Sequence, residues 1–300
     1  MTGRPEVFRW LLNVEERWPA LDASGKVTKS TKEWGSSKDV EPTLDRLPPE
    51  EKAKVLRFHF IRDAKLCLGS FLLKHHAIAF VCNLSWAETV ISEDENRKPC
   101  YKATDPNGQT LEFNVSHHGT LVAMVGCTGH KTKMGVDVVQ MNFEKDFAAV
   151  KLDKGGFSGW VKTYELVFSD REIAEISGYT TPAASDFRVE IKAKLCHFYA
   201  HWCLKEAYVK MTGEALLASW LKDLEFRNVQ VPLPSSQLQS KENPGDWGQI
   251  STDTEIWFRG SRVTDVKMEL QAYGENYMIA TAISDPSVPL PCFQPSIIKI

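Results

Sequence analysis

The chain has 300 residues, 43% hydrophobic and 25% charged, a composition typical of a globular protein with one large or two modest domains. Its net charge of −3 gives no electrostatic basis for nucleic-acid binding, and no apolar run approaches the roughly 20 residues that span a bilayer. We therefore expect neither nucleic acid nor a membrane as a partner. Seven scattered cysteines without a CxxC pair indicate reduced thiols, which predicts a cytoplasmic protein.

The first half of the chain contains predicted strands on either side of a helical stretch. Residues 7–14 form a candidate strand, and residues 24–42 are polar and loop-like. Pro48 and Pro49 open a stretch whose apolar spacing predicts two helices, continuing to about residue 80. The runs "LEFNV", "LVAMVG" and "MGVDVV" follow, separated by turn residues. This pattern predicts an antiparallel meander of three strands.

The second half contains one long predicted helix and three closing strands. Residues 140–164 have no clear pattern, and a helix then runs from about Ala184 to Met211, with Gly213 as its C-cap. Residues 231–249 are rich in Pro and Ser and predict an inserted loop. The closing strands are "TEIWFRG", "DVKMELQAY" and "NYMIATAI". Each half therefore offers helices and strands, which predicts the α+β class with antiparallel sheets.

Glu206 lies in the apolar stripe of the long predicted helix. Successive helical residues turn by about 100°, which brings Glu206 within about 40° of the direction of Leu195, Trp202 and Val209. The alternative is a surface ion pair with Lys210 at i,i+4, worth about 0.2–0.5 kcal/mol. A carboxylate that faces a core is costly unless it is paired or binds a metal. The position therefore favours a functional role for Glu206.

Asp137 is a second carboxylate in an apolar element. It stands between Val136 and Val138, although Asp is disfavoured in strands, and alternation places it on the opposite face from both valines. An exposed strand face or a turn is the alternative interpretation. Together with Glu206, Asp137 suggests a hard-cation site, because Mg²⁺ takes one or two carboxylates, with water and substrate phosphate as further ligands. Such a site favours phosphoryl chemistry.

Two further features suit a phosphate group. The segment "NVSHHG", residues 114–119, suits a tight turn between strands, and a turn that exposes backbone N–H groups beside a histidine can also hold a phosphate. Basic residues recur along the first helical stretch, where they form either a solvated face or a grip for a phosphate monoester. They are Lys52, Lys54, Arg57, Arg62 and Lys65.

Zinc is not indicated by the sequence. Cys127-x2-His130 and the pair His117–His118 are near one another in the chain, but we find no second Cys or His pair at ligand spacing. The sequence also lacks a Walker A motif and a GxGxxG motif.

Five motifs in order resemble those of the Sfp-type 4'-phosphopantetheinyl transferases, in their large monomeric, eukaryotic-like form. They are "RFHFIRDAKLCLGS", "RKPCY", "FNVSHHG", "GVDVV" and "WCLKEAYVK". Each motif is weak alone, but "GVD" followed about 65 residues later by "WxxKEAxxK" is specific. The resemblance extends from about Leu47 to Gly213.

The resemblance implies a transferase that moves the phosphopantetheine arm of coenzyme A (CoA) to a serine of an apo acyl, peptidyl or aryl carrier protein. Adenosine 3',5'-bisphosphate is the other product. CoA is the co-substrate and Mg²⁺ the metal, with Mn²⁺ as the alternative ion. The implied fold is a pseudo-dimer of two similar α+β lobes in a monomeric chain. We place the lobes at residues 1–133 and 134–300, with the metal site and the inserted loop in the second lobe.

The resemblance also implies roles for individual residues. Asp137 and Glu206 match metal ligands, Glu206 also matches the base for the serine proton, and Lys210 matches the residue that neutralises phosphate charge. The remaining matches concern CoA itself. They are Ser116 and His117 at the CoA phosphates, Lys98 near the adenine and phosphate end, and Lys54, Arg62 and Lys65 in the segment that holds the 3'-phosphate.

One position departs from the family pattern. Many members have an acidic residue two positions after the "GVD" aspartate, where this chain has Val139. A water, His118 or Gln140 would have to supply the third ligand. Two other functions remain open at this stage: a different Mg²⁺-dependent phosphohydrolase or nucleotidyl transferase, and a CoA- or carrier-binding module without activity. The class of carrier, in fatty acid, polyketide and nonribosomal peptide or lysine biosynthesis, is open as well.

Overall fold

The computed structural model describes residues 7–19, 30–94, 98–101, 111–128, 132–180, 186–214, 218–238 and 246–295. The chain divides into two compact units: unit 1 comprises Met1–Thr132 and Val288–Ile300, and unit 2 comprises Lys133–Ser287. The predicted division after residue 133 lies one residue from this boundary. The assignment of the last residues to the second lobe needs correction, because β13 (Gln294–Pro295) pairs with β1 (Val7–Asn13) of unit 1.

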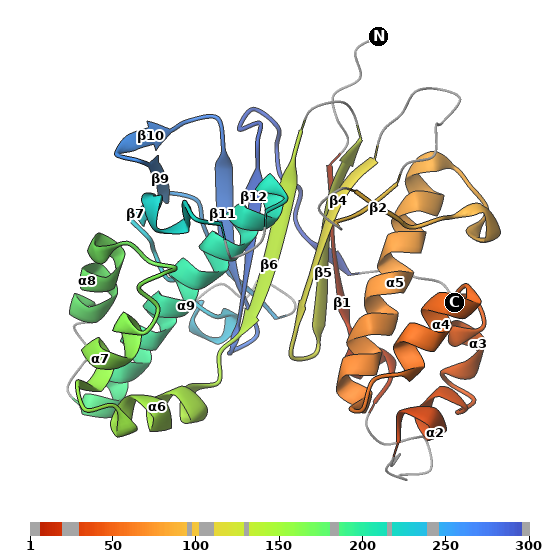
Figure 1. Ribbon diagram of the computed structural model, residues 1–300, viewed down its shortest axis with the longest axis horizontal. Helices are drawn as coiled ribbons and strands as arrows, with labels where there is room; N and C mark the ends of the chain where they lie inside the picture. Colours follow the sequence, from red (N-terminus) through yellow and green to blue (C-terminus); the bar gives the residue numbers. More distant parts are fainter. Residues whose placement is uncertain are drawn as a thin grey trace. The chain divides into compact units, whose positions relative to one another are not determined.

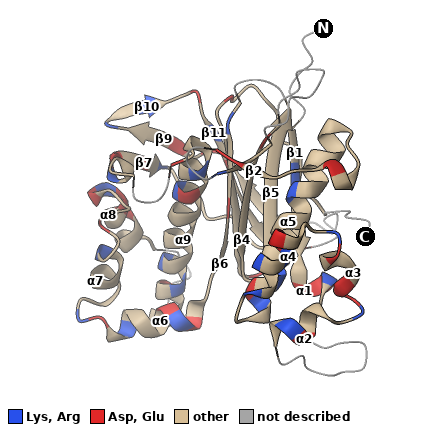
Figure 2. Ribbon diagram, turned by 45° about the vertical axis from the view of Figure 1, so that its right-hand side comes forward, with Lys and Arg blue, Asp and Glu red and all other residues tan. Residues whose placement is uncertain are grey.

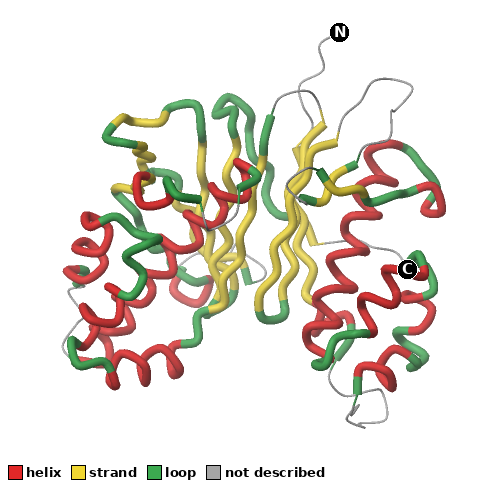
Figure 3. The backbone as a smooth tube through the Cα atoms, in the orientation of Figure 1, coloured by secondary structure: helices red, strands yellow, loops and turns green. Residues whose placement is uncertain are grey.

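Unit 1 is a four-stranded sheet covered on one face by a long helix (Figures 1 and 3). The strand order is β13-β1-β5-β4, with β5 at Leu121–Thr128 and β4 at Leu111–His118. The pairs β1/β5 and β4/β5 are antiparallel, and β1/β13 is parallel. The covering helix is α5 (Ile61–Cys82). The smaller elements are α1 (Val14–Arg17), α2 (Thr31–Gly35), α3 (Glu41–Leu44), α4 (Pro49–Leu56), the 3-10 helix η1 (Trp86–Glu88), β2 (Ser92–Glu93) and β3 (Pro99–Cys100).

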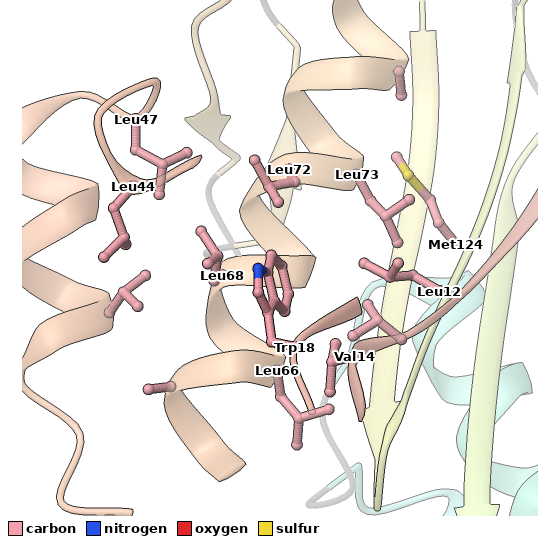
Figure 4. Close-up of a cluster of buried hydrophobic side chains, with 14 of the residues drawn as sticks. Leu12, Val14, Trp18, Leu44, Leu47, Leu66, Leu68, Leu72, Leu73 and Met124 are labelled. Atoms are coloured by element: carbon pink, nitrogen blue, oxygen red, sulfur yellow. The ribbon is translucent and has the colours of Figure 1, made fainter. Parts of the chain in front are cut away.

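The core of unit 1 forms where α5 meets the sheet and α1 (Figure 4). Trp18 is packed among Leu68, Leu72 and Val14, and all four side chains are excluded from solvent. Each large apolar side chain buried in this way contributes roughly 1.5–3 kcal/mol. Gly69 allows the close approach, because a Cβ there would lie 3.0 Å from side-chain carbons of both Leu12 and Val14.

Among the described residues, helix α5 is long and apolar enough to cross a membrane when judged by length and composition alone. This corrects the sequence-based statement that no such run exists. The helix contains buried Lys65 and Lys74, and its apolar residues belong to the unit 1 core. A core helix passes the same test, so this single helix is weak evidence for a membrane span.

Unit 2 is a second four-stranded sheet with the order β6-β12-β11-β8, antiparallel throughout (Figure 1). Its strands are β6 (Met134–Gln140), β12 (Tyr277–Ile283), β11 (Lys267–Tyr273) and β8 (Trp247–Ser251). The long helix α9 (Phe187–Thr212) packs on this sheet and ends at Gly213, whose φ of 82° is left-handed as predicted for the C-cap. The other elements are α6 (Phe143–Leu152), α7 (Gly156–Lys162), α8 (Asp170–Gly178), the 3-10 helices η2 (Leu221–Asp223) and η3 (Ser235–Gln237), and a small sheet of β7 (Leu224–Arg227), β9 (Glu255–Phe258) and β10 (Ser261–Val263).

The α+β class is confirmed, and the structure corrects or completes several local expectations. The meander does not form, because β6 pairs with β12, so that of the three predicted strands β4 and β5 alone pair with each other. Residues 140–164 contain α6 and α7, and the described part of residues 24–42 contains α2 and α3. Within the predicted loop at 231–249, η3 and the start of β8 are ordered elements, and residues 239–245 lie outside the described residues. Turn signals mark strand ends, but they do not select the partner of a strand.

Candidate active site

Helix α9 lies directly against strand β6 at Gly135. A Cβ at this position would lie 2.1 Å from the carbonyl oxygen of Ala207 and 2.4 Å from the backbone nitrogen of Met211, so only glycine fits. Asp137 is two residues further along β6, and its side chain therefore points to the same helix-facing side of the sheet. The Cys203 thiol lies 3.5 Å from the Asp137 carbonyl oxygen, which shows that the helix stays close along this stretch.

This packing brings together Asp137, Glu206 and Lys210. Lys210 Nζ lies 2.5 Å from Asp137 Oδ1, and the Asp137 side chain is only 7% exposed. Glu206 is four residues before Lys210, one helical turn away, and is half-buried. Helix α9 carries both acidic and basic residues (Figure 2). Three residues from two elements thus form one compact, charged cluster in an apolar setting.

The electrostatics of Glu206 suit a group that accepts a proton. Burial, and then the nearby negative charge of Asp137, raise the pKa of Glu206 to about 7, while Lys210 lowers it. A base is most effective when its pKa is near the working pH. The carboxylates of Asp137 and Glu206 also provide the oxygen donors that Mg²⁺ prefers, so the residues present fit a divalent cation.

Lys205, the neighbour of Glu206, has a different environment. Its ammonium lies 2.9 Å from Glu172 Oε2 in helix α8, with both side chains excluded from solvent. It also donates to the backbone carbonyls of Leu221, at 3.0 Å, and Leu224. Residues one apart on a helix differ by about 100° in direction, so Lys205 and Glu206 face different neighbours. The lysine of "KEA" is therefore held inside the fold of unit 2.

Ser116 and His117 lie within strand β4, although the sequence predicted a turn there. They pair with Ala123 and Val122 of β5, and the turn begins only at Gly119, whose φ is 63°. Successive strand residues point to opposite faces, so Ser116 is buried whereas His117 is exposed. The prediction of a turn that exposes backbone N–H groups beside the histidine is therefore wrong. His117 can instead contact a phosphate through its exposed side chain.

The predicted basic residues of unit 1 have diverse environments. Lys98 Nζ lies 2.5 Å from Glu112 Oε1, and Arg62 is exposed beside Asp63 at 3.3 Å. Lys54 is exposed on α4. Lys65 is only 4% exposed and lies 2.9 Å from Glu15 Oε2.

Comparison with known proteins identifies the relatives of this chain. A family model described as "4'-phosphopantetheinyl transferase superfamily" matches residues 133–277, and one described as "4'-phosphopantetheinyl transferase, N-terminal" matches residues 32–129. A 4'-phosphopantetheinyl transferase of Aureobasidium melanogenum is 34% identical over 91% of this chain and 89% of its own length. The 4'-phosphopantetheinyl transferase 1 of Fusarium mangiferae is 33% identical over 93% and 87%.

The chain belongs to the 4'-phosphopantetheinyl transferase family. It is similar, at 22% identity over 80% of its residues, to the L-aminoadipate-semialdehyde dehydrogenase-phosphopantetheinyl transferase of Homo sapiens, 68% of which it covers. The family assignment predicted from the five motifs is confirmed. The chain is thus a transferase that uses CoA as a substrate and modifies carrier proteins.

Within this transferase, Val139 cannot serve as a metal ligand. It is 3% exposed and packs with Ala207 and Met211 in the core between α9 and the sheet. Gln140, the next residue, is half-buried at the end of β6. His118, the other suggested ligand, lies in β4 of unit 1 and is exposed. The position two residues after Asp137 therefore serves core packing.

The transferase has one cationic residue near His117 that sequence reasoning missed. Lys74 of α5 and His117 line the same cavity of about 210 Å³, together with Phe58, Asp63, Leu66, Cys67, Ser70 and Phe71. Burial lowers the pKa of Lys74, and its ammonium lies 4.6 Å from the centre of the Phe71 ring. Lys65 is nine residues earlier on α5, about 180° around the helix, which explains why it contacts Glu15 instead. Only the helical phase of α5 could have singled out Lys74.

Proposed function

We propose that this chain transfers the 4'-phosphopantetheine arm of CoA to a serine of an apo carrier protein in a Mg²⁺-dependent reaction, with Mn²⁺ as the alternative ion. The observation that carries the proposal is the cluster of Asp137, Glu206 and Lys210 in a chain that belongs to this family. The proposal includes the role of each of these residues.

Glu206 acts as the base. Its carboxylate accepts the proton of the carrier serine, the serine oxygen forms a bond to the phosphorus of the pantetheine phosphate, and the bond from that phosphorus to the bridging oxygen breaks. The electron pair of the broken bond leaves with adenosine 3',5'-bisphosphate. The raised pKa of Glu206, about 7, supports this role because the group can accept a proton near neutral pH.

Asp137 and Glu206 would hold the metal, and Lys210 would balance phosphate charge. A divalent ion bound there supplies positive charge that offsets the charge of the CoA pyrophosphate. Lys210 Nζ is 2.5 Å from Asp137 Oδ1. When CoA binds, this ammonium group can move from the carboxylate to a phosphate oxygen. Two protein carboxylates are sufficient for Mg²⁺, because waters and substrate phosphate complete its shell, so the loss of a third acidic residue at Val139 is compatible with the site.

The unit 1 residues are proposed as CoA contacts. His117 and Lys74 share a cavity, and we assign them to CoA phosphate groups together with Ser116. Lys54, Arg62, Lys65 and Lys98 remain proposed contacts at the 3'-phosphate and adenine end. The burial of Lys65 and its ion pair with Glu15 make it the weakest member of this group.

The carrier class and the cellular setting are further parts of the proposal. Acyl, peptidyl and aryl carrier domains are all candidate acceptors, and the name of the human relative adds a carrier of the L-aminoadipate-semialdehyde dehydrogenase type. We propose a monomeric, cytoplasmic enzyme whose partners include neither nucleic acid nor a membrane. The net charge of −3 supports the exclusion of nucleic acid.

The test is a transfer assay with CoA, Mg²⁺ and a panel of apo carriers, read by intact-protein mass. Transfer adds about 340 Da to the carrier, the mass of the phosphopantetheine group. Glu206→Gln should abolish the mass shift while CoA binding remains measurable. EDTA should stop transfer and Mg²⁺ should restore it. CoA cleavage without a labelled carrier would instead indicate a phosphohydrolase, and CoA binding without turnover under any metal would indicate a binding module.

A further inference from the structure

Two histidines and one glutamate come together where α8 packs against α9. His197 and His201 are one helical turn apart on α9, and Glu175 faces them from α8. One ligand atom from each of the three residues lies within 4.8 Å of those from the other two. His197 Nε2 is 4.0 Å from Glu175 Oε1. The spacing His-x3-His on a helix aims both rings in one direction, as metal-binding histidine pairs require.

Both imidazoles are buried and incompletely hydrogen-bonded. The exposed fractions are 1% for His197 and 0% for His201. His197 Nε2 lies 3.3 Å from the Val229 carbonyl oxygen, and His201 Nδ1 lies 3.0 Å from the His197 carbonyl oxygen. Among the residues that the structure describes, His197 Nδ1 and His201 Nε2 have no hydrogen-bond partner. A buried polar atom without a partner costs stability, whereas a ring nitrogen without a proton can bind a metal.

The protonation states also suit metal binding. Burial lowers the pKa of His197 to about 4 and that of His201 to about 3, so both rings are neutral at pH 7. Neutral imidazole is the form that binds a metal, and two histidines with one carboxylate are a donor set that zinc uses in proteins. Imidazole nitrogen is a better ligand for zinc and the neighbouring first-row transition metals than for Mg²⁺.

We propose that Glu175, His197 and His201 form a site for a divalent transition-metal ion of the zinc class, which fastens α8 to α9. Zinc–nitrogen bonds of about 2.0–2.1 Å require the donor atoms to move slightly closer together. Glu175 can make this movement because its side chain is 31% exposed. The site is distinct from the proposed magnesium site, since His201 and Glu206 are five residues apart and point about 140° away from each other on α9.

The competing explanation is a pair of neutral histidines that only fill space. His197 stacks on Tyr179, with ring centres 4.2 Å apart and planes 7° apart, and such packing alone would keep both rings in place. The two explanations differ in whether the intact protein takes up a stoichiometric metal ion.

The experiment uses the full chain, stripped of metal with a chelator and returned to buffer that contains millimolar Mg²⁺, which occupies the oxygen-donor site. Co²⁺ is added as a spectroscopic probe, and Zn²⁺ is added in separate thermal unfolding measurements. We expect one Co²⁺ per chain with visible absorption bands of low coordination number, displacement of Co²⁺ by Zn²⁺, and a Tm that rises with Zn²⁺ concentration.

Two variants and one control locate the ion. Glu175→Gln, at a half-buried position, should weaken Co²⁺ binding at least tenfold, and His201→Gln should abolish the visible bands. Asp170→Asn is the matched control, because Asp170 is on the same helix with its side chain 90% exposed, and it should bind as the wild type does. Failure to bind stoichiometric metal would overturn the site, as would binding that Glu175→Gln changes by less than twofold. If His201→Gln does not fold, the Co²⁺ affinity of Glu175→Gln alone still tests the proposed site.

Discussion

Lys205 Nζ and Glu172 Oε2 form an ion pair 2.9 Å long in which neither side chain is more than 1% exposed. Glu172 is further satisfied by the backbone N–H groups of Ser169 and Phe226, each 2.9 Å from a carboxylate oxygen. A buried pair of this kind is costly to break, because the remaining charge has no partner.

Lys205→Met should therefore lower the free energy of unfolding by about 3–5 kcal/mol. The measurement is urea or thermal denaturation of the purified protein. Glu172→Gln in the same chain removes the orphaned charge but keeps an acceptor oxygen, so the double variant should regain part of the loss. If the double variant is as unstable as the sum of the two single variants, the pair is not coupled and this account of Lys205 is wrong.

Gly135→Ala should damage both stability and transfer. The added Cβ meets the Ala207 carbonyl oxygen at 2.1 Å, so α9 must move away from β6, and overpacking of this kind costs roughly 3 kcal/mol or more. The movement would also separate Asp137 from Glu206 and Lys210. Gly178→Ala is the control, because a Cβ at the end of α8 meets nothing within 4 Å, and it should be neutral in both assays.

Relative to the Glu206→Gln variant, the stability of the metal-free protein should fall as the pH rises from about 4.5 to 7. The comparison with the variant isolates Glu206, because the buried, neutral His197 and His201 contribute a slope of opposite sign below about pH 6.5 that both proteins share. In this window the folded state holds a proton on Glu206, whose pKa is raised to about 7 chiefly by burial, and the unfolded chain has lost it. Glu206 is half-buried, so solvent screening reduces the effect to about 1–3 kcal/mol. Chemical denaturation in EDTA at several pH values should therefore show the free energy of unfolding of the wild type falling relative to that of Glu206→Gln across this window. Glu165→Gln, at an exposed position, should keep the pH dependence of the wild type.

Lys74→Met should weaken CoA binding roughly tenfold, because it removes about one charged hydrogen bond to a phosphate. Isothermal titration with CoA measures this directly, without a carrier protein. Lys32→Met is the control, since Lys32 is exposed on α2, away from the cavity that Lys74 shares with His117. Equal CoA affinity in the wild type and Lys74→Met would remove Lys74 from the set of CoA contacts.

Local periodicity was sufficient to predict the helices that carry the site. The 3.6-residue repeat gave α4, α5 and α9 with bounds close to the observed ones, and Gly213 marked the end of α9. The same repeat placed Glu206 among apolar residues, and the motif spacing related it to Asp137. These features depend on neighbours within a few residues or on the family resemblance.

The parts that were missed depend on contacts distant in sequence. The partner of β6 is β12, more than 130 residues later, and no turn signal specifies such a choice. Lys205 and Glu206 are adjacent charged residues, and only the position of α8 makes the first a buried structural charge and the second a half-buried site residue. The pair His197 and His201 does have His-x3-His ligand spacing, so the sequence-based statement that no second Cys or His pair has such spacing was wrong. The third residue of the group, Glu175, is distant in sequence and joins the pair only through the packing of α8 against α9.

The parallel pairing of β13 with β1 has a consequence for the order of events on the ribosome. Strand β1 leaves the exit tunnel among the first residues of unit 1, but one of its two neighbours is made only after all of unit 2 has been translated. Until then one edge of the nascent sheet has unpaired backbone groups, a template for incorrect pairing. Unit 2 is continuous in sequence, so it can complete its own sheet and helix while unit 1 still waits for its final strand.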